Sequence, residues 1–195
     1  SHLRFGKEPI RMPYLVHQAD FIACHRQSYV HNFDLLQGIK DGGTFLLNCT
    51  WSEDELEEKL PASLKRSIAR NHVKFYILDA VGIARKIGLG GRINMVMQSA
   101  FFKLANVIPL DLAISKLKDS VVTSYGKKGQ HVVDMNWAAI DAGVKAIVPV
   151  DYPASWADAV DAPAEPVKHS KFFEQFAAPM EALQGDTFPV SIYDG

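Results

Sequence analysis

The chain has 195 residues, 48% of them apolar, enough to bury a substantial core in one domain. Its 21 lysines and arginines against 22 aspartates and glutamates give a formal net charge of -1, which excludes a strongly basic surface for nucleic acid or anionic membranes. Only two cysteines, no metal-type spacing and no signal-like or membrane-spanning run occur, so we expect a soluble cytoplasmic protein without a metal site.

The first half of the chain predicts three units, each a strand followed by helix. Strands are expected over residues 20–25, 44–48 and 73–79, because each is a short apolar run bounded by polar residues. Apolar residues at three- and four-residue spacing predict a first helix over 29–39, which should end at the glycines within 40–43. These buried runs favour a mostly parallel sheet.

A capping box predicts where the second unit's helix begins. Ser52 and Glu55 are three residues apart, so each side chain can bond the other residue's backbone N–H. This helix should end before Pro61 and be followed by a second helix over 63–71, and the third unit's helix should span 80–87. Three successive units indicate a right-handed α/β domain with helices covering the sheet.

The second half predicts three helices in a row. Their expected ranges are 93–106, 111–125 with Asp111 as the cap, and a third one containing 132–144 after a glycine-bounded turn at 126–129. Together with the first half, they indicate a three-layer α/β/α domain with a Rossmann-like sheet followed by a helical half.

Four prolines between residues 148 and 168 favour an extended strap that links rather than folds. A short helix over 170–184 and an extended tail over 187–195 should follow. We therefore divide the chain into an α/β domain, residues 1–148, and a strap with short helix and tail, residues 149–195, leading to a next domain. The abrupt ends indicate a piece of a longer polypeptide.

Residues 88–94, Gly-Leu-Gly-Gly-Arg-Ile-Asn, are the most specific candidate for a binding site. They directly precede a predicted helix, whose unpaired amides and positive dipole end suit a phosphate. Arg92 adds a cation and Asn94 an amide. The alternative, which the residues alone favour, is that the glycines only end the preceding helix while Arg92 pairs with a carboxylate.

Other reactive residues are expected to be structural. Cys24 and His25 lie at the end of the strand predicted over 20–25, where adjacent side chains point to opposite faces, so they cannot readily share a proton. Cys24 and Cys49 are both expected in the buried core. Lys127 and Lys128 are expected in a solvated turn, and the acidic residues of 53–58 on a solvated helix face. With no nucleophile–base pair and no metal set, the sequence predicts no complete active site.

Several segments together resemble the gamma, or third, domain of the single-chain pyruvate:ferredoxin (flavodoxin) oxidoreductases. The resemblance extends over nearly the whole chain and is carried by residues 1–6, 9–11, 19–25, 42–48, 88–95, 100–104, 125–129 and 188–191. It implies a domain of an enzyme that converts pyruvate and coenzyme A to acetyl-CoA and CO2 and reduces ferredoxin or flavodoxin. The family's gamma domain normally begins with a glycine-rich strand-loop-helix ahead of Ser1.

The resemblance also implies where the cofactors lie. Thiamine diphosphate, magnesium and iron–sulfur clusters would be held by other domains of the same polypeptide, and the parent enzyme would be a homodimer. The family's gamma domain is implicated in presenting coenzyme A, which implies a coenzyme-binding role for Gly90, Gly91, Arg92 and Asn94 and no catalytic residue. The alternative is a purely structural module that docks neighbouring domains and binds no ligand.

Overall fold

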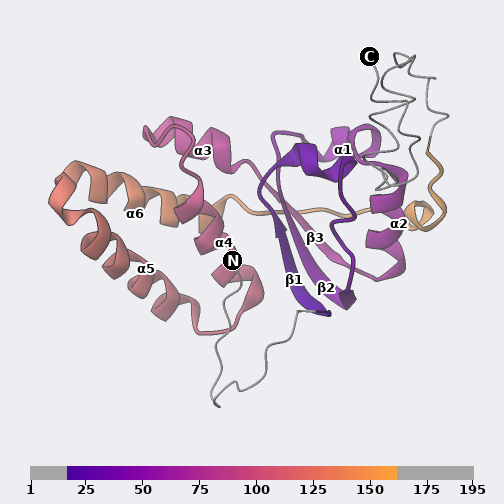
Figure 1. Cartoon of the computed structure of the whole chain (residues 1–195), viewed down its shortest axis with the longest axis horizontal. Coiled ribbons are helices and arrows are strands. Elements are labelled where there is room, and N and C mark those ends of the chain that lie inside the picture. Colours follow the sequence, from indigo (N-terminus) through magenta and orange to yellow (C-terminus); the bar gives the residue numbers. More distant parts are fainter. Residues whose placement is uncertain (1–16, 162–195) are drawn as a thin grey trace, which may run out of the picture. The chain divides into compact units, whose positions relative to one another are not determined.

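A computed structural model describes residues 17–161, and the predicted features within 1–16 and 162–195 lie outside this range. Figure 1 shows the arrangement of the main elements. In chain order they are β1 (Ala19–Cys24), η1 (Gln27–His31), β2 (Ile39–Asn48), α1 (Glu53–Lys59), α2 (Ala62–Arg70), β3 (Lys74–Leu78), α3 (Ala80–Ile87), α4 (Asn94–Ala105), α5 (Leu110–Tyr125), η2 (Gly126–Lys128), α6 (Gln130–Lys145), β4 (Val148–Pro149) and η3 (Ala154–Asp158), where η denotes a short 3-10 helix.

The four strands form one sheet in the order β1-β2-β3-β4. β1, β2 and β3 are parallel, and β4 pairs with β3 in the antiparallel direction. The register places Phe45 opposite Phe75, and their rings stack with centroids 5.4 Å apart. The predicted, mostly parallel sheet is therefore confirmed, and its three main strands are those expected from the sequence.

The sheet has helices on both faces, as Figure 1 shows. Phe45 and Leu47 point toward α1 and α2, whereas Leu46 points toward α3, α4 and α6, and all three are fully buried. This alternation explains why β2 is a continuous apolar run, since a strand covered on both faces has no solvent-facing side. α5 packs on α4 and α6 through a smaller core. The three-layer α/β/α class is confirmed.

The prediction of a helix over residues 29–39 is wrong. The structure has only the short η1 there, and Ile39 begins β2. Tyr29 and Phe33 are exposed, and their ring centroids lie 5.3 Å apart. These two residues therefore form a local aromatic pair and do not belong to the buried face of a helix. Gly42 and Gly43 lie within β2, where Gly42 has φ +70° and the register with β1 is interrupted.

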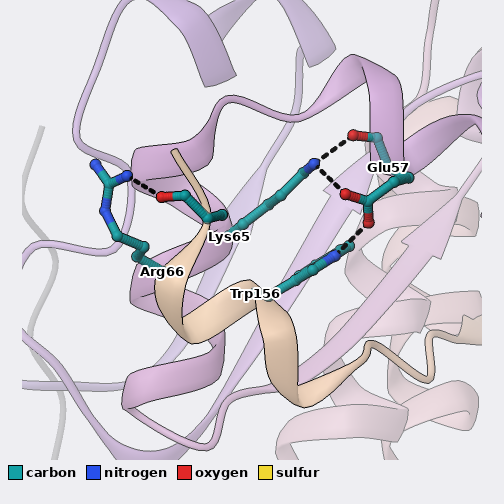
Figure 2. Close-up of polar contacts among 5 residues, drawn as sticks. Glu57, Lys65, Arg66 and Trp156 are labelled. Atoms are coloured by element: carbon teal, nitrogen blue, oxygen red, sulfur yellow. Dashed lines mark hydrogen bonds and ion pairs between the residues drawn. The ribbon is translucent and has the colours of Figure 1, made fainter. Parts of the chain in front are cut away.

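Residues 149–160 differ from the expected linking strap, because they pack on the domain. β4 adds to the sheet edge, and η3 packs on α2, where Trp156 is 3% exposed. Figure 2 shows the contacts: Lys65 donates to a carboxylate oxygen and the backbone carbonyl of Glu57, and the Trp156 indole N–H donates to the same carboxylate. Prolines disfavour helices but do not prevent such packing. The division at 148/149 stays a prediction.

The other helices predicted within residues 17–161 are confirmed with small changes at their ends. The capping box before α1 is present, and the Ser52 N–H donates to Glu55 Oε2 at 2.9 Å. Pro109, not Asp111, occupies the cap of α5, and Asp111 lies in its first turn. Among residues 17–161, no helix is both long and apolar enough to cross a membrane.

Candidate functional site

A cleft of about 300 Å³ lies at the carboxyl ends of β1 and β2, beside the first turns of α3. This is the edge at which open parallel sheets usually bind ligands, because the connecting loops leave a crevice there. The sequence supplies polar residues where each strand ends, and parallel pairing brings the two strand ends together. The cleft is lined by His25, Arg26, Gln27, Ser28, Asn48, Cys49, Thr50, Val81 and Arg85.

Asn48 holds three parts of this edge together. Its side chain is 4% exposed; Nδ2 donates to the carbonyl of His25 at 2.9 Å, and Oδ1 accepts from the backbone N–H of Ala80 at 2.9 Å. One buried amide therefore joins the ends of β1 and β2 to the start of α3. Because a buried amide is costly to leave unpaired, these bonds specify the positions of the connecting loops.

A second polar contact stabilises the rim of the cleft. Gln27 Oε1 accepts from the backbone N–H of Thr50 at 3.0 Å and from its hydroxyl at 3.3 Å. The loop after β1 is thus bonded to the loop after β2. The rim is preorganised by contacts that involve neither Arg26 nor Arg85.

The two cysteines are structural, as predicted. Burial raises the pKa of the Cys24 thiol, whose Sγ–H donates to the carbonyl of Arg26 at 3.1 Å. Burial is also the main cause that raises the pKa of Cys49 to about 11. A thiol with a raised pKa is protonated near neutral pH, so neither side chain is a ready nucleophile. His25 is exposed, and its side chain has no hydrogen-bond partner among residues 17–161.

The neighbouring cleft, about 360 Å³, lies between the ends of β2 and β3 and includes Asp79 and Lys86. Asp79 is the cap of α3, and its Oδ1 accepts from the backbone N–H of Gly82 at 2.8 Å. The Asp79 carboxylate therefore has a structural role. Within the described range, no group of three or more His, Cys, Asp or Glu side chains could hold a metal ion.

The predicted segment 88–94 forms the α3–α4 connection, and none of its residues lines either cleft. Gly88 ends α3 and has a left-handed backbone with φ +95°. The structural alternative expected a glycine to end this helix, and Gly88 is that glycine. A Cβ at Gly90 or Gly91 would meet nothing within 4 Å. These glycines therefore border open space rather than a tight packing contact.

Arg92 and Asn94 are both exposed, next to the start of α4. No side chain caps this 12-residue helix, so its first amides remain available. No ion pair joins Arg92 to a carboxylate within residues 17–161, unlike the arrangement that the structural alternative expects. The ligand role of Gly90, Gly91, Arg92 and Asn94 stays a prediction.

Among the residues that line the carboxyl-edge cleft, the sequence analysis considered His25 but did not identify Arg26 or Arg85. Arg26 lies two residues after the end of β1, whereas Arg85 lies far along the chain, in the last turn of α3. The available signal was the polar residues directly after two buried strands, since parallel strands present their carboxyl ends at one edge. That signal could locate the loops but could not assign Arg85 to the same cleft.

Comparisons with known proteins agree on one family. The family described as "Pyruvate ferredoxin/flavodoxin oxidoreductase" matches residues 1–146. The chain is 54% identical over its whole length to pyruvate-flavodoxin oxidoreductase of Enterobacter agglomerans. It is 56% identical over 99% of its length to pyruvate:ferredoxin oxidoreductase of Moorella thermoacetica. The chain spans 17% of the length of each of these relatives.

A mitochondrial pyruvate dehydrogenase [NADP(+)] of Euglena gracilis is 46% identical over 98% of the chain, which spans 11% of that relative. Among solved structures, pyruvate oxidoreductase subunit PORC of Thermotoga maritima is similar, with a TM-score of 0.52 and 18% sequence identity. That match covers 69% of this chain and 67% of the subunit. The structural likeness supports the fold, and the sequence relatives carry the family.

Proposed function

Since this chain belongs to the pyruvate ferredoxin/flavodoxin oxidoreductase family, we propose that it serves as one non-catalytic domain of a larger enzyme. That enzyme oxidatively decarboxylates pyruvate with coenzyme A to acetyl-CoA and CO2, and it passes the electrons to ferredoxin or flavodoxin. Relatives named for flavodoxin, ferredoxin and NADP(+) all match this chain.

The parent enzyme's thiamine diphosphate, magnesium and iron–sulfur clusters belong to its other domains. An iron–sulfur cluster takes about four cysteine ligands, whereas the chain has two cysteines, both buried. These two residues do not fit a cluster. The partners of this domain are then the other domains of a cytoplasmic homodimer, which meets ferredoxin or flavodoxin elsewhere.

The domain contributes a scaffold and a surface that faces coenzyme A. The observation that carries this role is the exposed Arg92 beside the uncapped start of α4, with open space at Gly90 and Gly91. The amides and dipole of a helix start attract a phosphate, and a guanidinium adds a charge-assisted hydrogen bond. Arg92 would bind and orient the coenzyme without taking part in bond making or breaking.

Replacing Arg92 with alanine in the full-length enzyme tests this role. We expect the KM for coenzyme A to rise about tenfold, because one charge-assisted bond to a phosphate is lost. The kcat at saturating coenzyme A should stay near the wild-type value. Lys127→Ala removes an exposed cation on η2 and is the matched control. An unchanged KM for coenzyme A in the Arg92 variant would remove this residue from the site.

A second candidate function, a structural docking module without a ligand, is supported by exposed apolar residues. Val107, Leu112 and Val122 on α5 and the preceding loop are 58%, 48% and 47% exposed. Large exposed apolar side chains are typical of surfaces that contact other domains. Under this alternative, Leu112→Ser would impair assembly of the full-length enzyme, measured by gel filtration, while Arg92→Ala would leave the KM for coenzyme A unchanged.

A further inference from the structure

Two arginines from different elements line the carboxyl-edge cleft, and neither has a counter-ion among residues 17–161. Arg26 follows β1, and Arg85 lies on α3. Both are exposed, and neither side chain forms an ion pair or a hydrogen bond with any of residues 17–161. By contrast, Arg70 donates to a backbone carbonyl at 2.9 Å. Within the described part of the chain, no residue occupies the donors of the Arg26 and Arg85 guanidinium groups, which line one cavity.

The charged side chains that line this cavity, Arg26 and Arg85, are both cationic. His25 is the other titratable nitrogen base in the lining, and no aspartate or glutamate belongs to it. Asp79 lines the neighbouring cleft, where its Oδ1 already accepts from the N–H of Gly82. An anion in the cleft would therefore meet cations and no carboxylate among the lining residues, even though the chain as a whole has a net charge of -1.

Apart from Val81 and Cys49, the rest of the lining is polar, and three of its side chains are held in place by hydrogen bonds. Thr50 is bonded to Gln27 across the rim, and buried Asn48 joins both loops to α3. Ser28 adds a hydroxyl group. Preorganised surroundings reduce the entropy lost on binding, and guanidinium forks match the geometry of phosphate oxygens. The cavity of about 300 Å³ is at the small end of the range for ligand pockets.

We propose that the Arg26–Arg85 cleft is a binding site for a phosphate or diphosphate group, distinct from the start of α4. Arg26 and Arg85 supply the charge-assisted hydrogen bonds, and the hydroxyl groups of Ser28 and Thr50 supply neutral ones. The group can belong to an organic coenzyme or to a free inorganic anion, since both present the same oxygens to the two arginines.

The proposal is tested by titrating the 195-residue chain with inorganic pyrophosphate at constant ionic strength, with calorimetry for affinity and amide shifts for location. We expect the amides of residues 25–28 and 48–50 to shift. Arg26→Gln and Arg85→Gln should each raise the Kd for pyrophosphate about tenfold. Lys127→Gln, which removes the same charge from η2, should change the Kd less than about twofold. Melting temperatures verify that the variants fold, since both arginines are exposed.

Absence of pyrophosphate binding, or equal losses in Lys127→Gln and the two arginine variants, would overturn the proposal. So would shifts confined to residues 90–94. Coenzyme A distinguishes the sources: displacement of pyrophosphate by coenzyme A assigns the site to an organic phosphate, and lack of displacement assigns it to a free anion. This result is independent of the Arg92 test, because that test measures a KM in the full-length enzyme and concerns another surface.

Discussion

Gly143 lies where α6 passes closest to α4. A Cβ at this position would overlap Ser99 Oγ and the carbonyl oxygen of Val96, and it would come within 3.0 Å of the Val96 carbonyl carbon. Ser99 is fully buried, and its hydroxyl donates to the carbonyl of Val96 at 3.0 Å, so it has little room to move. The close contact between α4 and α6 therefore depends on the absence of a side chain at Gly143.

Gly143→Ala is expected to lower the free energy of unfolding by about 1–2 kcal/mol. Overpacking costs about 1–3 kcal/mol, and the gain in helix propensity, about 1 kcal/mol, offsets only part of it. Urea denaturation measures the difference. Gly126→Ala is the control, because Gly126 has φ -54° and its nearest neighbour is Val122 Cγ1 at 3.9 Å. Equal stability of the two variants would show that α4 and α6 separate without cost.

At the scale of elements, a polar contact holds η3 on α1 and α2. Lys65 is 7% exposed, and its Nζ lies 2.7 Å from Glu57 Oε1 and 5.7 Å from the centroid of the Trp156 ring. Hydrogen bonds from Lys65 and from Trp156 are the main causes that lower the pKa of Glu57. A buried lysine needs such a partner, since an unpaired buried charge is costly.

This contact predicts an acid-dependent loss of stability. Because the pKa of Glu57 is lower in the folded than in the unfolded chain, its contribution is fully present above about pH 4.3, the ordinary range of a glutamate. It is lost as the pH falls through the folded-state pKa. Glu57→Gln should therefore reduce the difference in unfolding free energy between pH 7 and pH 3, measured by urea denaturation.

Glu58→Gln is the control for this experiment, since Glu58 is exposed on the same helix and the charge change is the same. The Glu57 carboxylate is itself largely exposed, so solvent screening limits the size of the effect. An identical pH dependence in wild type and Glu57→Gln would contradict the role of this carboxylate in holding η3.

At the scale of the described domain, the core has two parts on the sheet faces and a third between α5 and α6. β2 lies at the centre, with Phe45, Leu46 and Leu47 fully buried. α5 packs on α4 and α6 and contributes no side chain to the two core clusters on the sheet faces. An outer helix with fewer buried contacts opens at a lower free energy than a central strand.

Native-state hydrogen exchange should therefore detect α5 opening before β2. Val121→Ala removes a side chain that is 1% exposed and should lower the opening free energy of α5 amides by about 2 kcal/mol. Val122→Ala alters the adjacent side chain, which is 47% exposed, and should change the opening free energy of the α5 amides by less than about 0.5 kcal/mol. If Val121→Ala accelerated exchange in α5 and β2 equally, the domain would open as one unit.

Much of the fold could be predicted from local patterns. Strands at 20–25, 44–48 and 73–79 were predicted because a strand buried on both faces is a continuous apolar run, and the helices because their apolar stripes repeat every three or four residues. The same spacing over 29–39 predicted a helix that does not form. Periodicity cannot distinguish a buried stripe from exposed Tyr29 and Phe33.

The sequence by itself determined the α/β class, the capping box, the buried role of both cysteines and the family resemblance, because each depends on residues close together in the chain or on a shared pattern. Only the tertiary structure placed η3 on α2 and brought Arg85 to the cleft beside Arg26. Those contacts depend on strand pairing and helix packing between distant segments, which local residue preferences do not specify.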